Sequence, residues 1–226
     1  MNKLRHDIKE ILWLSLTFCL IWFASNYFYN YGLLYATITS SVVLSNTSPI
    51  WVYVISLSCC VPNRVRENFS WIKFLMILVS LSGFGLIAWQ DDSGSSDPTE
   101  KPLTGDLLSI AGAICYAFYA VYLRVKVPDE NDSGFKFTYF LGFVGLMNDV
   151  FLLPLFPIFN YTGLETFEWP SRTTLLYLTI NAFFGTFVSD YCWARSVVLL
   201  GPLITTLGIT LTFPISGIYD IYYKGD

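Results

Sequence analysis

Seven long apolar stretches constrain this chain more than any other feature of its sequence. Each is long enough to cross the roughly 30 Å hydrocarbon core of a bilayer as a helix of about 20 residues. Backbone groups inside lipid must be hydrogen-bonded within a helix or a closed barrel, and the stretches lack the alternation typical of barrel strands. We therefore predict an all-α, polytopic membrane helical bundle with about seven transmembrane helices. Their expected bounds are 11–31, 34–60, 74–90, 107–123, 137–158, 174–196 and 202–222.

The composition agrees with a lipid environment. Of the 226 residues, 54% are hydrophobic and only 13% are charged, whereas soluble domains carry roughly 25% charged residues. So few charges cannot cover the surface of a water-soluble core. The composition excludes soluble enzymes, disordered chains and secreted disulfide scaffolds. No basic stripe accompanies the net charge of −4, so we expect no nucleic-acid partner.

We expect no catalytic residues, no metal site and no cofactor. The five cysteines lie within apolar stretches, where free cysteine behaves as a small hydrophobe, and the single histidine is His6. One histidine without a CxxC pair does not supply the ligands of a zinc site. The sequence contains no HExxH motif, no Ser/His/Asp set and no Gly-rich phosphate loop. The protein is therefore not expected to be an enzyme.

Basic residues are distributed unequally between the two sides of the membrane. When the connections between spans are assigned alternately, ten basic residues fall on the side of the N-terminus and three on the other. The positive-inside rule then predicts a cytosolic N-terminus and a lumenal C-terminus. The ten are Lys3, Arg5, Lys9, Arg64, Arg66, Lys73, Arg124, Lys126, Lys136 and Arg195, and the three are Lys101, Arg172 and Lys224.

Residues 37–50 and 202–215 resemble each other without gaps at a constant offset of 165, which pairs Pro49 with Pro214. The predicted topology runs these two segments in opposite directions across the membrane. An inverted repeat of this kind is typical of many secondary transporters. The alternative is a chance match between two Ser/Thr-rich helices that end in proline, and the opposite directions argue against it.

Several separated segments carry a resemblance to a known family. The motifs around Pro49, at Gly83-x-Gly85 and at the start of the stretch 107–123 resemble the EamA-type repeats of the drug/metabolite transporter superfamily. Further segments are similar to subfamily F of solute carrier family 35 and its fungal vacuolar relatives. These segments are Trp22–Tyr27, Gly142–Asn148, Tyr161–Glu168 and Ile180–Trp193.

The resemblance implies ten spans in two inverted five-helix repeats, of which this chain would contain the third to the ninth. We therefore expect residues 1–90 to form a partial first repeat of three spans, 91–105 an acidic loop, and 106–226 a second repeat without its last span. On this interpretation the chain is truncated at both ends, as a fragment, an isoform or an incomplete gene model.

The functional expectation is a multi-pass transporter of the drug/metabolite type that moves a small polar metabolite by alternating access. The resemblance leaves the substrate open as nucleotide-sugar-like, thiamine-like or unknown. The alternative is a truncated, transport-inactive membrane protein that acts as an interaction or regulatory subunit. Expected partners are the lipid bilayer, the metabolite, and either a second copy or helices that replace the missing spans. We expect the protein to lie in an endomembrane, vacuolar/lysosomal or Golgi, rather than in the plasma membrane.

Polar side chains inside spans are costly and usually face the bundle interior or a water-filled path. We predict that such residues line a substrate path at the interface of the repeats. The alternative is that they form ordinary packing seams between helices. The candidates are Asn26, Tyr27, Asn46, Tyr116, Tyr119, Asn181, Ser189 and Thr205.

Three ionisable residues within or near spans are candidates for coupling to a proton or to substrate: Asp190, Arg195 and Asp149. For Asp190 the alternative is a structural pair with Arg195 or a hydrogen bond to a neighbouring helix. For Asp149 it is stabilisation by an unidentified partner. Pro49 and Pro214 are candidate hinges because proline interrupts helical hydrogen bonding, and the alternative is a tolerated transmembrane proline.

Overall fold

The computed structural model describes residues 8–36, 38–58, 61–62, 66, 68–92, 102–127, 137–163 and 169–210. All regular secondary structure in these ranges is helical, which confirms the predicted all-α membrane bundle. The elements are α1 (Ile8–Gly32), α2 (Ile38–Ser45), α3 (Ser48–Leu57), α4 (Trp71–Asp92), α5 (Pro102–Lys126), α7 (Phe137–Leu152), α8 (Leu155–Thr162), α9 (Arg172–Ile180), η1 (Asn181–Val188), α10 (Ser189–Leu200) and α11 (Pro202–Thr210).

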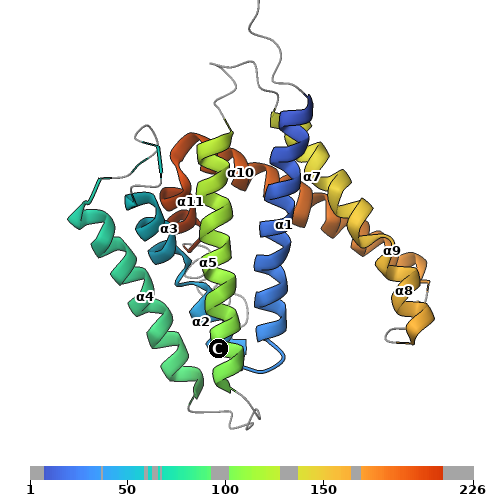
Figure 1. The fold of residues 1–226 in the computed structure, drawn as a ribbon. Coiled ribbons are helices and arrows are strands. Elements are labelled where there is room, and N and C mark those ends of the chain that lie inside the picture. Colours follow the sequence, from blue (N-terminus) through green and yellow to red (C-terminus); the bar gives the residue numbers. More distant parts are fainter. Residues whose placement is uncertain are drawn as a thin grey trace, which may run out of the picture.

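Helices α1 and α5 lie side by side in the middle of the molecule (Figure 1). Helices α2, α3, α4 and α11 pack on one side of this pair, and α7 packs against α1 on the other. The chain crosses the molecule alternately downward and upward as α1, α2–α3, α4, α5, α7–α8, α9–η1–α10 and α11. These segments coincide with the seven predicted spans, and the seventh is described as far as Thr210.

Three helical segments are long and apolar enough to cross a bilayer: Lys9–Gly32, Leu103–Lys126 and Phe137–Thr162, the last of which comprises α7 and α8. A shorter apolar helix covers Trp71–Gly83. The α1 and α5 spans extend beyond the predicted bounds by one to five residues at each end, because polar residues at the ends of apolar stretches still join the helix.

Two of the predicted spans are interrupted rather than continuous, and each interruption lies beside a proline. Between α2 and α3 the helix stops at Asn46 and Thr47, just before Pro49. Between α7 and α8 it stops at Leu153 and Pro154. Proline has no N–H to donate, and its ring clashes with the carbonyl four residues earlier. The apolar pattern identified these spans but did not indicate where they break.

The sixth span contains a π-helical segment, η1, between α9 and α10. Ser171 caps the start of α9 by accepting a hydrogen bond from the backbone N–H of Thr174 at 3.2 Å. At the other end Gly201 adopts a φ of 95°, a conformation that favours glycine, and Pro202 begins α11. This glycine-proline pair reverses the chain between the sixth and seventh spans.

Small residues bring α1 and α5 into close contact. A Cβ at Gly105 would lie 2.8 Å from the carbonyl oxygen of Gly32, and one at Gly112 would lie 3.2 Å from that of Ser25. The Ser25 hydroxyl donates to the Gly112 carbonyl at 2.9 Å, and Ser109 donates to Gly105 at 3.0 Å. Close small-residue seams are the usual means by which membrane helices associate. The Ser/Gly stripe of α5 is therefore at least partly a packing seam.

The buried side chains form two clusters. The first lies between α1, α5, α7 and α10, toward the upper end of Figure 1, and contains the largest buried aromatic residues. The second lies between α3, α4, α5 and α11. Members of the first are Phe18, Tyr119, Leu123, Phe137, Phe140 and Val197, and members of the second are Val52, Tyr53, Ala117, Val121 and Leu203.

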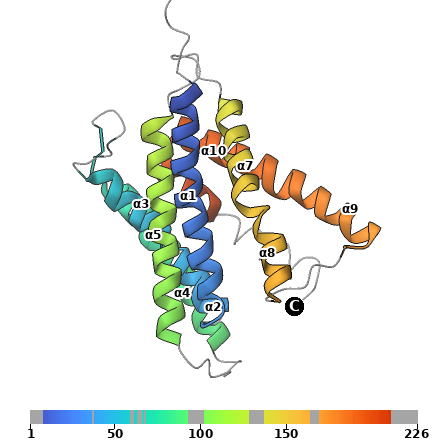
Figure 2. The same ribbon diagram turned by 45° about the vertical axis from the view of Figure 1, so that its right-hand side comes forward.

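The helices α8 and α9 do not pack against each other among the described residues. Helices α8 and α9 overlap in Figure 1 but lie well apart in Figure 2. No residue of α8, α9 or η1 is buried by the parts of the chain that are described. The segments α7–α8 and α9–η1–α10 therefore separate toward α8 and α9, whereas α1 and α5 stay in contact.

Candidate substrate path

An aromatic cluster joins α5 to α10 near the middle of the fourth span. It consists of Tyr116 and Tyr119 from α5 and Trp193 from α10. The ring centroids are 5.0 Å apart for the two tyrosines, 6.0 Å for Tyr116 and Trp193, and 5.4 Å for Tyr119 and Trp193. The ring planes are inclined by 57° to 70° to one another. Edge-to-face packing of this kind stabilises aromatic pairs beyond the area that they bury.

The Tyr116 hydroxyl and the Trp193 indole N–H are paired between helices. The indole Nε1 of Trp193 donates a hydrogen bond to the Tyr116 hydroxyl at 2.9 Å. The Thr206 hydroxyl of α11 also interacts with the Tyr116 hydroxyl. Its neighbour Thr205 is buried and donates to the carbonyl of Gly201, the residue before α11, at 2.9 Å. Three spans therefore meet at Tyr116.

Asp190 lies beside this cluster, at the start of α10. Its side chain is half-buried and is close enough to interact electrostatically with Tyr119. Asp190 and Trp193 are three positions apart, so they share a face of the helix. The structure thus brings Asp190 into electrostatic range of Tyr119, and Tyr119 into contact with Tyr116, three residues that the sequence indicated separately.

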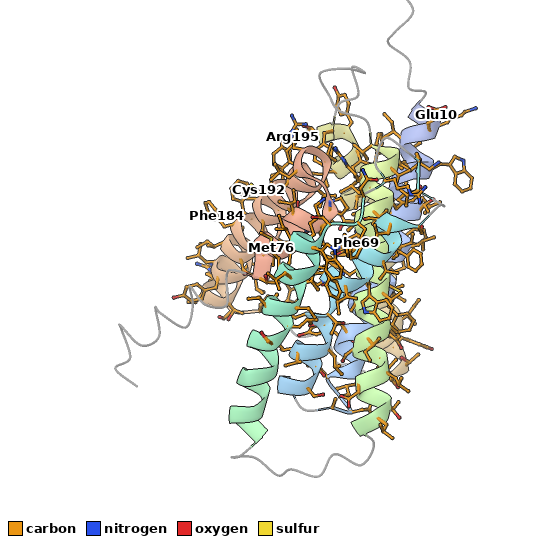
Figure 3. All side chains as sticks on the ribbon, turned by 90° about the vertical axis from the view of Figure 1, so that its left-hand side faces the viewer. Glu10, Phe69, Met76, Phe184, Cys192 and Arg195 are labelled. Carbon is orange, nitrogen blue, oxygen red and sulfur yellow. The ribbon has the colours of Figure 1, made fainter. Side chains whose placement is uncertain are left out.

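The side chain of Arg195 lies over α7 and on a different side of α10 from Asp190. Five residues of α-helix turn through about 500°, which places Arg195 about 140° around α10 from Asp190. Its guanidinium lies 6.0 Å from the ring centroid of Phe137 on α7, and Figure 3 shows it toward the same end of the molecule as Glu10. This geometry favours separate roles for Asp190 and Arg195 over a structural ion pair between them.

Asp149 is exposed on α7 and is not part of the cluster. It is residue 13 of the 26 in the apolar segment Phe137–Thr162, which places it at mid-membrane depth. A carboxylate at this depth is costly unless it faces water, a ligand or a polar partner. Its role in coupling remains a prediction.

The amide groups of two candidates, Asn26 on α1 and Asn46 after α2, donate hydrogen bonds to backbone carbonyls four residues earlier. The side chain of Asn26 donates to the Trp22 carbonyl at 2.8 Å, and that of Asn46 donates to the Val42 carbonyl at 2.7 Å. Tyr27 is 52% exposed and stacks on Tyr31 with ring centroids 5.5 Å apart. The structure does not bring Asn26 or Tyr27 to the aromatic cluster.

The candidates on the sixth span lie before Asp190. Asn181 and Ser189 are exposed, and the Oδ1 of Asn181 lies 2.6 Å from the position of a Cβ on Gly185. Figure 3 shows Phe184 of the same segment pointing away from the bundle. π-Helical segments frequently occur at functional sites, and η1 positions Asp190 at its C-terminal end.

The two hinge candidates differ in what the structure describes. Pro49 is fully buried in the first turn of α3, directly after the break in the second span. Pro214 lies outside the described residues. An interruption at Pro49 is therefore observed, and the hinge motion remains a prediction.

Trp193 and Thr206 were not among the residues predicted for the path, although they provide its interhelical contacts. For Trp193 the sequence did contain a signal, since its spacing of three from Asp190 places both on one helix face. For Thr206 the periodicity did not distinguish the residue from Thr205 beside it.

A bundle of apolar helices that cross the molecule in alternating directions is the fold of a multi-pass membrane protein. The family model SLC35F, described as Solute carrier family 35, matches residues 1–200. The chain belongs to solute carrier family 35, and the predicted family is confirmed.

Curated relatives cover nearly all of this chain. It is 32% identical to an uncharacterized vacuolar membrane protein of Saccharomyces cerevisiae over 99% of the chain and 58% of the relative. It is 34% identical to mouse solute carrier family 35 member F5 over 94% of the chain and 39% of the relative. A thiamine-repressible mitochondrial transport protein of S. cerevisiae is 31% identical over 96% of the chain and 57% of the relative. The chain thus spans about 40% to 60% of their lengths. No solved structure matches it.

Proposed function

We propose that this chain takes part in moving a small polar metabolite across a membrane by alternating access. The observation that carries the proposal is the site where α5, α10 and α11 meet, with a Trp193–Tyr116 hydrogen bond and with Asp190 in electrostatic range of the neighbouring Tyr119. Polar groups at an interface between spans are expensive unless they serve a ligand, water or one another. Relatives named as transporters support the same class of function.

The fold offers a fixed part and a moving part for alternating access. The glycine contacts between α1 and α5 leave little room for relative movement. Helix α10 is attached to the exposed segments η1 and α9, and it meets α11 after the chain reversal at Gly201. We therefore propose that α10 rocks against the α1–α5 pair, with the break before Pro49 as one hinge.

We propose Asp190 as the coupling residue, because it is the acidic group at the aromatic cluster. Asp149 is a second candidate for coupling, and it lies at mid-membrane depth on α7 rather than on α10. A carboxylate that accepts a proton on one side of a membrane and releases it on the other is a common means of coupling in transporters.

The proposal includes the orientation of the chain across the membrane and the membrane in which the protein lies. Basic residues at the start of α1 and α4 and at the ends of α5 and α10 share one side, whereas α9 begins with Arg172 on the other. The positive-inside rule favours a cytosolic N-terminus. The vacuolar relative favours an endomembrane. We also propose that 1–90 and 106–226 belong to two inverted repeats, because α2 and α11 occupy corresponding positions in the sequence repeat.

The test is uptake into proteoliposomes that contain the full chain, with thiamine and a UDP-sugar as tracers at several external pH values. The comparison is between the unmodified protein, Asp190→Asn, and the matched control Glu10→Gln, which removes a carboxylate at the start of α1. We expect uptake of at least one tracer, pH dependence in the unmodified protein and control, and loss of that dependence in Asp190→Asn. Unchanged pH dependence in Asp190→Asn rejects the coupling role, and absence of uptake for every tracer rejects transport by this chain.

A further inference from the structure

We propose that the end of the α1–α5 pair that carries Lys9, Arg124 and Lys126 binds the headgroup of one anionic phospholipid. This surface faces the surrounding bilayer and is separate from the path between α5 and α10. The site goes beyond the proposed transport function and does not depend on it. It follows from the register of the two helices, the depth of their basic residues and the distribution of charge over the chain.

Helices α1 and α5 run antiparallel in a register that their contacts define. A Cβ on Gly105 would lie 2.8 Å from the Gly32 carbonyl oxygen, and the Ser25 hydroxyl donates to the Gly112 carbonyl at 2.9 Å. Between these two contacts α1 moves back by seven residues and α5 moves forward by seven. The two helices therefore advance at the same rate, and they pack side by side along their lengths (Figure 1).

This register brings the basic residues of the two helices to one end of the pair. Continued toward the start of α1, it places Trp13 opposite Arg124 and Ile11 opposite Lys126. Ile11 is buried in the first cluster with residues from the last turns of α5, as the register requires. Lys9 is two residues beyond Ile11, so its long side chain starts near the end of α5.

The basic residues lie at the depth of lipid headgroups. The apolar segments Lys9–Gly32 and Leu103–Lys126 both have a lysine at this end. Trp13 is 70% exposed and lies four positions after Lys9, on the same face of α1. Tryptophan is enriched at the membrane–water interface, where the headgroups lie. The helix ends therefore present positive charge at the level of the phosphates.

The basic side chains are available to a ligand. Lys9 and Lys126 are exposed, and Arg124 is half-buried. Within the described part of the chain, these three side chains have no hydrogen-bond or ion-pair partner. Arginine binds phosphate through two parallel N–H groups, whereas lysine acts as a point charge. Together they suit a phosphodiester that has a further negative charge beside it.

The charge of this side of the molecule is opposite to that of an anionic headgroup. Connections and helix ends on the side of Lys9 contain ten basic and six acidic residues, whereas those on the other side contain three and nine. Juxtamembrane lysine and arginine attract anionic lipids. Asp129, Glu130 and Asp132 follow α5 directly and lie outside the described residues. They are the alternative partner of the basic side chains, within the chain itself, and a measurement of lipid binding distinguishes the two.

The apolar surface next to the basic residues favours a lipid over a soluble anion. Leu20 of α1 and Phe118 of α5 are 55% and 53% exposed. In the same register Leu20 lies opposite Ala117, so these two exposed side chains are at nearly the same depth. Acyl chains cover such side chains, and each buried methylene group adds to the affinity. A phospholipid is therefore the ligand whose headgroup and acyl chains match the two parts of this surface.

Native mass spectrometry of the full chain in detergent tests this inference, because it resolves lipids that bind one at a time. The probes are phosphatidylserine, which is anionic, and phosphatidylcholine with the same acyl chains, which is zwitterionic. We expect the first phosphatidylserine to bind at least about fivefold more tightly than the first phosphatidylcholine, given the attraction of each basic residue for anionic lipid. Glycerophosphoserine has the same headgroup without acyl chains, and an excess of about a hundredfold should leave the bound phosphatidylserine in place.

Variants then assign the preference to the surface. The double variant Arg124→Gln/Lys126→Gln should reduce the preference for phosphatidylserine to less than about twofold. Lys126→Arg keeps the charge and should retain the preference. The matched control Lys101→Gln/Arg172→Gln removes two charges from the opposite side and should also retain it. Gel filtration of each variant verifies that the protein is folded.

The outcomes distinguish this site from general electrostatic attraction. Equal affinity for the two lipids overturns the inference and indicates that the acidic residues after α5 neutralise the basic ones. A preference that persists in Arg124→Gln/Lys126→Gln, or that the control Lys101→Gln/Arg172→Gln also removes, overturns the assignment to this surface. Displacement by glycerophosphoserine overturns a lipid as the ligand. None of these measurements involves uptake, so the site and the proposed transport function can fail independently.

Discussion

The indole N–H of Trp193 donates a hydrogen bond to the hydroxyl of Tyr116 across 2.9 Å, and this bond joins two spans whose residues are 77 positions apart in the chain. Tyr119 packs edge-to-face against both rings. The rotation of α10 about its axis is therefore determined by contacts with α5. The same contacts keep Asp190 in electrostatic range of Tyr119.

Removal of the Tyr116 hydroxyl, which accepts this hydrogen bond, should destabilise the contact between α5 and α10. Tyr116→Phe leaves the half-buried indole N–H without its tyrosine partner, and loss of such a hydrogen bond costs about 0.5 to 1.5 kcal/mol. We expect a lower melting temperature in detergent for Tyr116→Phe than for Tyr122→Phe, which removes a hydroxyl from the same helix. A double-mutant cycle with Trp193→Phe measures the coupling, and strictly additive effects would show that the bond contributes nothing.

The close contact of α1 and α5 predicts a strong effect at Gly105. A Cβ there would lie 2.5 Å from the backbone nitrogen of Ala36 and 2.8 Å from the carbonyl oxygen of Gly32. Backbone atoms cannot move aside easily, so Gly105→Ala should separate the helices and abolish a monodisperse gel-filtration peak or lower the melting temperature markedly. In the matched control Gly145→Ala on α7, no atom of the described residues lies within 4 Å of the added Cβ. That variant should be neutral or more stable by up to about 1 kcal/mol.

Replacement of two buried serines, Ser25 and Ser41, by alanine should have opposite effects on the stability of the protein. Ser25 donates to the Gly112 carbonyl between helices, and Ser25→Ala should cost about 0.6 kcal/mol, the mean value for polar contacts in membranes. The Ser41 hydroxyl is buried and has no hydrogen-bond partner in the described part of the chain. Ser41→Ala should therefore be neutral or stabilising. Unfolding in a denaturing detergent measures both, and a cost for Ser41→Ala that exceeds that for Ser25→Ala would contradict this assignment.

The break before Pro49 predicts a conformational effect. Alanine at this position restores a backbone donor and removes the ring clash, so Pro49→Ala should allow α2 and α3 to join and increase the helical signal in circular dichroism. If the break acts as a hinge, the rate of uptake falls while the protein remains folded. Pro62→Ala, at an exposed position after α3, is the control and should leave both measurements unchanged. Normal uptake in Pro49→Ala would reject the hinge.

The sequence alone determined where the chain crosses the membrane and which class of fold results. Apolar length decides this, because lipid accepts a backbone only when its hydrogen bonds are satisfied within the segment. The family was also accessible from separated motifs such as those around Pro49 and Trp193. Helical periodicity indicated that Tyr116 and Tyr119 share a region of α5, and that Asp190 is an unusual residue for a span.

Only the tertiary structure decided which of these polar residues meet. Asn26, Asn46 and Asn148 all bond to carbonyls of their own helices, whereas Tyr116 bonds to Trp193 across two spans. The difference depends on helix rotation and on how closely the backbones approach, which the glycines between α1 and α5 control. Periodicity defines the face of a helix but not its partner, because a partner 77 residues away is selected by packing between the helices.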